Sequence, residues 1–194
     1  MPASRRPSSC HPPPAAASSR PSTSSSPSGI DAMGAVRCWL IRHGKAAEAM
    51  PDDRARPLTK RGRRDAKAMR AWMLADHADD LPELWVASSA GRTRETAELL
   101  AGGADVSLES KLYGAWIGEF LTVMAATPTT IRCAAFVAHN PTVGVLFHAL
   151  SGREGAPRPY PTLGAALFEL PDGWTQPEAA KLLDFATPKS LPAR

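Results

Sequence analysis

Long apolar runs are missing from this sequence, since no stretch approaches the roughly 20 residues that a membrane-spanning helix needs. We therefore expect no membrane partner. Cysteine is also scarce, and Cys10, Cys38 and Cys133 match neither a zinc-binding spacing nor a disulfide framework. An unpaired cysteine behaves as a small hydrophobic residue in a core. We expect buried free thiols in a reducing compartment, which favours a cytoplasmic protein.

Excess positive charge is small as well. The 23 lysines and arginines exceed the 19 aspartates and glutamates by only four, and half of that excess falls in residues 1–33. A nucleic-acid-binding domain concentrates more charge and combines it with a recognisable motif. We therefore expect no nucleic-acid partner. The 22% of charged and 43% of hydrophobic residues are typical of a soluble globular protein.

Residues 1–33 contain almost no large apolar side chains and are dominated by serine, proline and alanine. Such a segment cannot bury enough surface to offset its chain entropy, which predicts a disordered tail. Two alternatives stay open: Met33 is the true start, or the segment is a targeting sequence, although it has no apolar stretch and no amphipathicity. In each case residues 34–194 are of a length typical of a single domain.

From residue 36 onward, apolar runs alternate with helical periodicities. Short apolar runs predict strands that are buried on both faces. Apolar residues at helical spacing predict the helices, with Thr59 as the N-cap of the first. The expected order is strand 36–41, helix 58–77, strand 84–87, helix 91–100, strand 106–108, helix 115–126, strand 134–138, helix 141–150, and strands 163–170 and 180–185.

This alternation predicts an α/β fold, in which a mostly parallel sheet carries helices on both faces as a three-layer αβα sandwich. The last two strands are separated by the turn Pro171-Asp172-Gly173 and only a few further residues. A connection this short suits antiparallel neighbours, because a parallel pair needs a long crossover. We therefore expect an antiparallel pair at the C-terminal end.

Unusual polar residues follow three of the predicted strands at the point where each strand ends. Arg42-His43-Gly44 follows the first strand, residues 88–92 follow the second, and His139-Asn140 follows the strand at 134–138. Ligands of open α/β sheets bind outside the carboxyl ends of the strands. We therefore expect two arginines and two histidines to converge at one edge of the sheet.

These residue types suit a phosphoryl group. Arg42 and Arg92 offer the planar, bidentate donors that a phosphate dianion prefers. Neutral imidazole is a competent nucleophile, which we assign to His43, and a proton-bearing His139 can stabilise an equatorial oxygen. We expect catalytic roles for these four residues. The candidate substrate contacts are Arg42, Arg92, Lys45, Ser88 and Asn140.

Paired histidines also raise the possibility of a metal site, which we do not expect. The sequence has no His-Glu-x-x-His and no Cys-x-x-Cys pattern, and two adjacent guanidinium groups would repel a dication. The ordinary structural interpretation is that the histidines are satisfied core groups and the arginines pair with surface carboxylates. The predicted helix from residue 58 is strongly basic, which is typical either of a solvated helix face or of a surface that steers anionic substrates.

The segment Leu40-Ile41-Arg42-His43-Gly44 resembles the signature of the histidine phosphatase superfamily, also called the phosphoglycerate mutase-like superfamily. The similarity extends from about residue 36 to about residue 188 and is narrower for the SixA-type phosphohistidine phosphatases. The supporting segments are Arg56-Pro57-Leu58-Thr59-x-x-Gly62, Ser88-x-x-x-Arg92-x-x-x-Thr96, Leu112-Tyr113 and His139-Asn140-Pro141.

The resemblance implies a phosphoglycerate mutase-like fold and a two-step reaction without metal or organic cofactor. His43 would take the phosphoryl group and water would hydrolyse the phosphohistidine enzyme, while Arg42, Arg92 and His139 would form the phosphate pocket. The implied substrate is phosphohistidine on a protein. A phosphate ester of a small molecule and a catalytically silent phosphate-binding module remain the alternatives.

The sequence departs from the superfamily at the position of a glutamate proton donor, because residues 111–115 contain no carboxylate. An alcohol leaving group needs a general acid, whereas an imidazole that leaves from phosphohistidine needs less help. Asp52, Asp53 and Glu119 are the remaining candidates for a proton donor. The loops near the predicted site are also short, which predicts an open, shallow pocket suited to a phosphorylated side chain on another protein.

Overall fold

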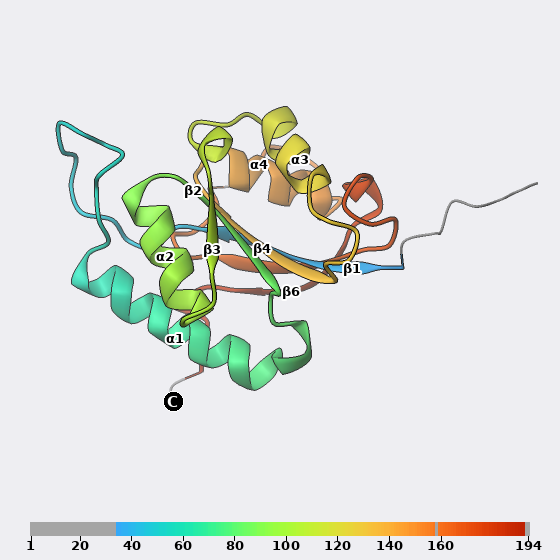
Figure 1. Cartoon of the computed structure of the whole chain (residues 1–194), viewed down its shortest axis with the longest axis horizontal. Helices are drawn as coiled ribbons and strands as arrows, with labels where there is room; N and C mark the ends of the chain where they lie inside the picture. The colour runs from blue at the N-terminus through green and yellow to red at the C-terminus, as the bar shows by residue number, and fades with distance from the viewer. Residues whose placement is uncertain (1–33, 158, 193–194) are drawn as a thin grey trace, which may run out of the picture. The chain divides into compact units, whose positions relative to one another are not determined.

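The computed structural model describes residues 34–157 and 159–192, so the predicted disordered tail 1–33 lies outside the described residues. The described part forms one six-stranded sheet with four α-helices (Figure 1). The strands are β1 Val36–Arg42, β2 Leu84–Ser88, β3 Val106–Glu109, β4 Cys133–Ala138, β5 Ala165–Leu170 and β6 Lys181–Ala186. The α-helices are α1 Lys60–Asp76, α2 Gly91–Ala101, α3 Ile117–Ala125 and α4 Thr142–Leu150, and short 3-10 helices span Ala78–Asp80, Ser110–Leu112 and Pro177–Ala179.

The strand order is β3-β2-β4-β1-β5-β6, with β1 and β4 at the centre. The four strands β1 to β4 are parallel, whereas β5 pairs antiparallel with both β1 and β6. The α/β prediction and the antiparallel C-terminal pair are therefore confirmed. The parallel register sets Arg42 of β1 opposite Ala138 of β4, which aligns the carboxyl ends of the two central strands.

Helices cover both faces of the sheet, as the three-layer arrangement requires (Figure 1). Met69 and Trp72 of α1 pack with Leu100 of α2 on one face, and Phe120 of α3 packs with Leu146 of α4 on the other. Full burial of a side chain of this size contributes roughly 1.5–3 kcal/mol each. The central strands are buried on both faces, which explains why their sequences read as continuous apolar runs.

The two cysteines of the described residues sit at the centre of this sheet. Cys38 on β1 and Cys133 on β4 are buried free thiols, and they face opposite sides of the sheet. Burial raises the pKa of both thiols, since the thiolate is poorly solvated in a core. The prediction of buried free thiols is thus confirmed for these two, and Cys10 lies outside the described residues.

Local signals in the sequence explain where the helices near the site begin and end. The Thr59 side chain accepts a hydrogen bond from the Gly62 backbone and caps α1, as expected. α2 ends at Ala101 and is capped by Gly102, whose φ of 58° is in the left-handed region that glycine adopts without strain. Among the helices of the described residues, none is both long and apolar enough to cross a bilayer.

Candidate active site

The carboxyl ends of β1, β2 and β4 bring together side chains that lie about fifty residues apart in the sequence. His43 directly follows β1, Ser88 ends β2 and His139 directly follows β4. The imidazole rings of His43 and His139 have their centroids 5.3 Å apart, with an angle of 60° between the planes. The predicted convergence of the two histidines at one sheet edge is therefore present.

A pocket of about 580 Å³ opens over these two rings. Six of the seven residues assigned to the site from the sequence line it. The complete lining consists of Arg42, His43, Lys45, Ala46, Ala47, Glu48, Arg56, Thr59, Arg92, His139, Asn140 and Thr162. The seventh, Ser88, is fully buried and stands outside the lining.

The hydrogen bond of His43 fixes the state of its ring. Nδ1 lies 2.8 Å from the Gly44 carbonyl oxygen, which can only accept, so Nδ1 carries the proton and Nε2 keeps its lone pair. The pKa of His43 is lowered to about 4, mainly by burial and to a smaller extent by the guanidinium groups of Arg92, Arg42 and Arg56, against the Gly44 hydrogen bond, which raises it. At neutral pH the ring is therefore an uncharged imidazole.

His139 makes its hydrogen bond through the other ring nitrogen. Its Nε2 lies 2.8 Å from the Ser88 hydroxyl, which bonds to no other group in the described part of the chain. The hydroxyl proton therefore points to Nε2, and Nδ1 carries the ring proton. Burial lowers the pKa of His139 to about 3, with the His43 ring as the next cause. Ser88 thus stands behind His139 and orients it, which differs from the predicted direct contact with substrate.

Three arginines surround the two rings, and two of them are held by Asp53. Arg42 donates through Nη1 to the Tyr160 carbonyl at 2.6 Å. Arg92, with a side chain only 7% exposed, donates to the Asp53 carbonyl at 2.7 Å and pairs with the Asp53 carboxylate at 2.9 Å. Arg56 pairs with the same carboxylate at 3.1 Å.

Several buried polar atoms at this site have no hydrogen-bond partner among the residues that the structure describes. They include the Nε atoms of Arg42, Arg56 and Arg92, the Nδ1 atom of His139 and the Oδ1 atom of Asn140. Four of these five atoms are N–H donors. Buried donors are normally satisfied, and all five residues that carry these unpaired atoms line the pocket, which suits an anionic ligand with several acceptor oxygens.

The carboxylates that were candidates for a proton donor are engaged elsewhere. Tyr113 donates to Asp53 at 2.9 Å, and this bond, together with Arg92 and Arg56, holds the pKa of Asp53 below its usual value. Asp52 accepts from the Arg54 backbone, and Glu119 accepts from the Trp116 backbone at the start of α3. Asp53 is therefore ionised, and none of the three carboxylates lines the pocket.

Reasoning from the sequence missed three contributors to the pocket. Arg56 begins one of the segments that resemble the superfamily, but no function was predicted for its side chain. Glu48 lines the pocket from the exposed loop that follows Lys45, and no sequence signal marks it. The Tyr160 carbonyl accepts from both Arg42 and Asn140, and a backbone acceptor leaves no trace in the sequence.

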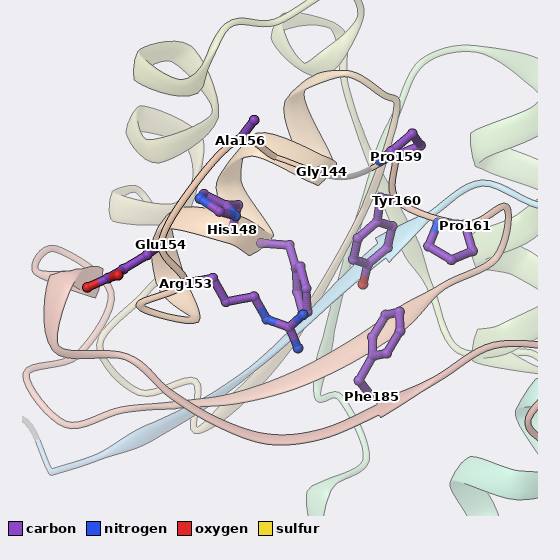
Figure 2. A pocket seen from close by; sticks show the side chains of 10 residues that line it. Gly144, His148, Arg153, Glu154, Ala156, Pro159, Tyr160, Pro161 and Phe185 are labelled. Atoms are coloured by element: carbon purple, nitrogen blue, oxygen red, sulfur yellow. The ribbon is translucent and has the colours of Figure 1, made fainter.

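Tyr160 also contributes to a second pocket of about 560 Å³ (Figure 2). Its ring lines that pocket with Phe147 and Phe185, and its hydroxyl donates to the Leu40 carbonyl at 2.9 Å. The segment that carries Tyr160 is thus fixed to β1 on one side while its carbonyl orients Arg42 on the other. This anchoring explains how the Arg42 side chain, at the end of β1, is held in place at the pocket.

Comparisons with known proteins agree with this geometry. Residues 38–153 match the model of the histidine phosphatase superfamily (branch 1). A structure named as a phosphohistidine phosphatase SixA from Nakamurella multipartitia is 27% identical with a TM-score of 0.68, and covers 80% of this chain and 97% of that one. A second, from Agrobacterium tumefaciens, is 29% identical with a TM-score of 0.66, at 78% and 97% coverage.

A third structure, named as the protein histidine phosphatase SixA with tungstate, is 21% identical with a TM-score of 0.68, covers 81% of this chain and 100% of that one, and shows the shared fold. None of the curated proteins matches the chain. The family match covers more than half of the sequence and includes Arg42, His43, Arg92 and His139. This chain therefore belongs to branch 1 of the histidine phosphatase superfamily, and the two SixA structures above are similar to it.

Proposed function

We propose that the protein is a metal-independent phosphatase that uses His43 as its nucleophile and acts on phosphohistidine carried by another protein. The observation that carries this proposal is the pairing of two uncharged imidazoles 5.3 Å apart with unpaired guanidinium donors around them. The guanidinium groups supply the positive charge that a phosphoryl group needs. They would also repel a divalent cation at the same place.

In the first step, the Nε2 lone pair of His43 attacks phosphorus and the bond between phosphorus and the leaving nitrogen breaks. The proton stays on Nδ1 and donates to the Gly44 carbonyl oxygen, which stabilises the positive charge that develops on the ring. Arg42, Arg92 and the Nδ1–H of His139 donate to the equatorial oxygens. Because these donors are held by Tyr160, Asp53 and Ser88, little reorganisation is needed.

In the second step, water attacks the phosphorus of phosphorylated His43. The P–N bond breaks, its electron pair returns to Nε2, and the water proton leaves with the phosphate product. His43 is then again a neutral imidazole with its proton on Nδ1, ready for another cycle. The low pKa of His43 favours this return, because the free ring does not hold a second proton at neutral pH.

The choice of phosphohistidine rests on the leaving group. The substrate imidazole departs as a neutral ring when its other nitrogen carries a proton, so the enzyme need not supply one. The Asp53 carboxylate beside the pocket is ionised and cannot act as an acid at neutral pH. The comparison structures with more than 25% identity are also named for phosphohistidine.

A phosphate ester of a small molecule is the second candidate, and Glu48 favours it. This carboxylate lines the pocket mouth and would be the proton donor that an alcohol leaving group requires. The two candidate functions differ in whether they require Glu48 as a proton donor. Replacement of Glu48 by glutamine leaves phosphohistidine turnover intact and reduces ester turnover.

A single-turnover assay without added metal tests the proposal. The wild type, His43→Ala and the matched control His148→Ala are each given a phosphohistidine protein and an aryl phosphate ester. We expect the wild type and His148→Ala to hydrolyse phosphohistidine faster than the ester, and His43→Ala to hydrolyse neither. Turnover of the ester alone would support the second candidate, and phosphate binding without any turnover would indicate a silent binding module.

A further inference from the structure

The catalytic pocket continues into a second hollow of about 440 Å³, and the two share Lys45 and Thr162. The hollow lies between the first turns of α1 and the segment that follows β6. We call it the cationic groove. Its lining consists of Lys45, Arg61, Asp65, Pro161, Thr162, Thr187, Pro188 and Lys189.

Positive charge dominates the cationic groove. Lys45, Arg61 and Lys189 contribute three cations, and Asp65 is the one carboxylate among its lining residues. Arg61 pairs with Asp65 at 3.3 Å, whereas Lys45 and Lys189 have no ion pair within residues 34–157 and 159–192. All three cations are exposed and available to a partner.

The start of α1 adds further positive charge beside the cationic groove. The N-terminus of a helix carries partial positive charge, so acidic residues are favoured there and basic ones are unfavourable. The first turn of α1 has no acidic residue and begins with Lys60 and Arg61, followed by Arg63 and Arg64. Arg63 is neutralised by Glu95, but Lys60 has no partner among the ion pairs of the described chain. An arrangement that disfavours the helix itself suggests an anionic partner at this end.

We propose that the cationic groove is a docking surface for an acidic segment of the protein that carries the phosphohistidine. The proposal rests on the function proposed above and names the kind of partner. Because the groove joins the catalytic pocket at Lys45, carboxylates a few residues from the phosphohistidine reach Arg61 and Lys189 while the phosphoryl group faces His43. An exposed ion pair contributes about 0.2–1 kcal/mol, so several together change the affinity by roughly tenfold.

Two synthetic peptides test the groove. Both contain one histidine, phosphorylated with phosphoramidate, and they differ in having four glutamates or four glutamines beside it. We expect the wild type to hydrolyse the glutamate peptide with about tenfold higher kcat/KM in low salt. The preference should largely disappear at 0.5 M salt, because screening weakens exposed charge pairs.

Variants then locate the preference on the protein. We compare kcat/KM for the glutamate peptide with kcat/KM for the glutamine peptide. This ratio should fall toward one in Lys189→Glu and in Arg61→Gln. The matched control is Lys181→Glu, which makes the same charge change at the other end of β6, about 17 Å from Ala186 along the strand. This control keeps the wild-type ratio. An equal loss in Lys181→Glu would mean that net charge and not the groove is responsible, and would overturn the proposal.

A binding measurement separates the groove from the reaction. His43→Ala is mixed with each fluorescent phosphopeptide and the affinity is read from anisotropy. A preference for the glutamate peptide here, with no turnover by the wild type, would keep the groove and refute the proposed function. Equal affinity for the two peptides, together with equal turnover, would refute the groove and leave the phosphatase assignment intact.

Discussion

Acidification of the free enzyme should reveal how strongly the site resists a second proton on its histidines. Burial lowers the pKa of His43 to about 4 and that of His139 to about 3. At pH 5 an unperturbed histidine is about 97% protonated, whereas His43 would be about 10% protonated. The unfolded chain therefore binds more protons than the folded chain between pH 6.5 and about pH 4.

The sign of the stability change follows from this difference. Because the unfolded state gains protons first, the free energy of unfolding falls as the pH decreases from 6.5 to about 4. For His43 the loss between pH 7 and pH 5 is about 2 kcal/mol, and His139 contributes a similar amount. The stability supplied by the neutral rings is thus fully present only above pH 6.5.

Urea unfolding at pH 7 and pH 5 measures this loss. The pair contributes about 4 kcal/mol to the loss in the wild type, and His43→Asn should reduce the total loss by about 2 kcal/mol, since asparagine does not titrate. Imidazole nitrogen chemical shifts provide the second measurement and should show the proton on Nδ1 of both rings. Equal acid losses in the wild type and the variant, or a His43 pKa near 6.5, would refute the reasoning.

Three further predictions concern single side chains. Ser88→Ala should lower kcat roughly tenfold with less effect on KM and move part of the His139 ring proton to Nε2, which nitrogen chemical shifts detect. Asp53→Asn should leave unchanged the dependence of rate on leaving-group pKa across aryl phosphates, because Asp53 is not the acid. Gly62→Ala should destabilise the fold by about 2 kcal/mol in urea unfolding, since a Cβ would lie 2.3 Å from the Lys45 carbonyl, whereas Gly118→Ala meets nothing within 4 Å and should not.

In the described residues, periodicity was sufficient to predict the strands and the α-helices, but not the three short 3-10 helices. All six strands and four helices were expected within two or three residues of their observed bounds. The largest differences have local causes: the strand expected from residue 163 begins at Ala165 because Leu163 has a positive φ of 54°. The strand order was not predictable, because pairing of β1 with both β4 and β5 joins segments more than ninety residues apart.

The candidate site was predictable where the chemistry resides in side chains at strand ends. Arg42, His43, Arg92 and His139 converge as the parallel sheet requires. Contacts made by the backbone were not predictable, such as the Tyr160 carbonyl that holds Arg42. The place of Ser88 was also missed, since a serine at the end of a strand can face the pocket or stand behind a neighbour, and only the three-dimensional packing decides between them.

The two thiols buried in the central sheet provide a way to measure how often the sheet opens. Cys38 and Cys133 belong to neighbouring strands that separate only when the sheet itself comes apart. A thiol reagent therefore reaches them only when these strands open, and at a high reagent concentration the modification rate reports the rate of that opening without any denaturant. Ligands that bind tightly in the phosphate pocket should slow the modification of both cysteines. The two residues would then report on occupancy of the pocket, although neither of them lines it.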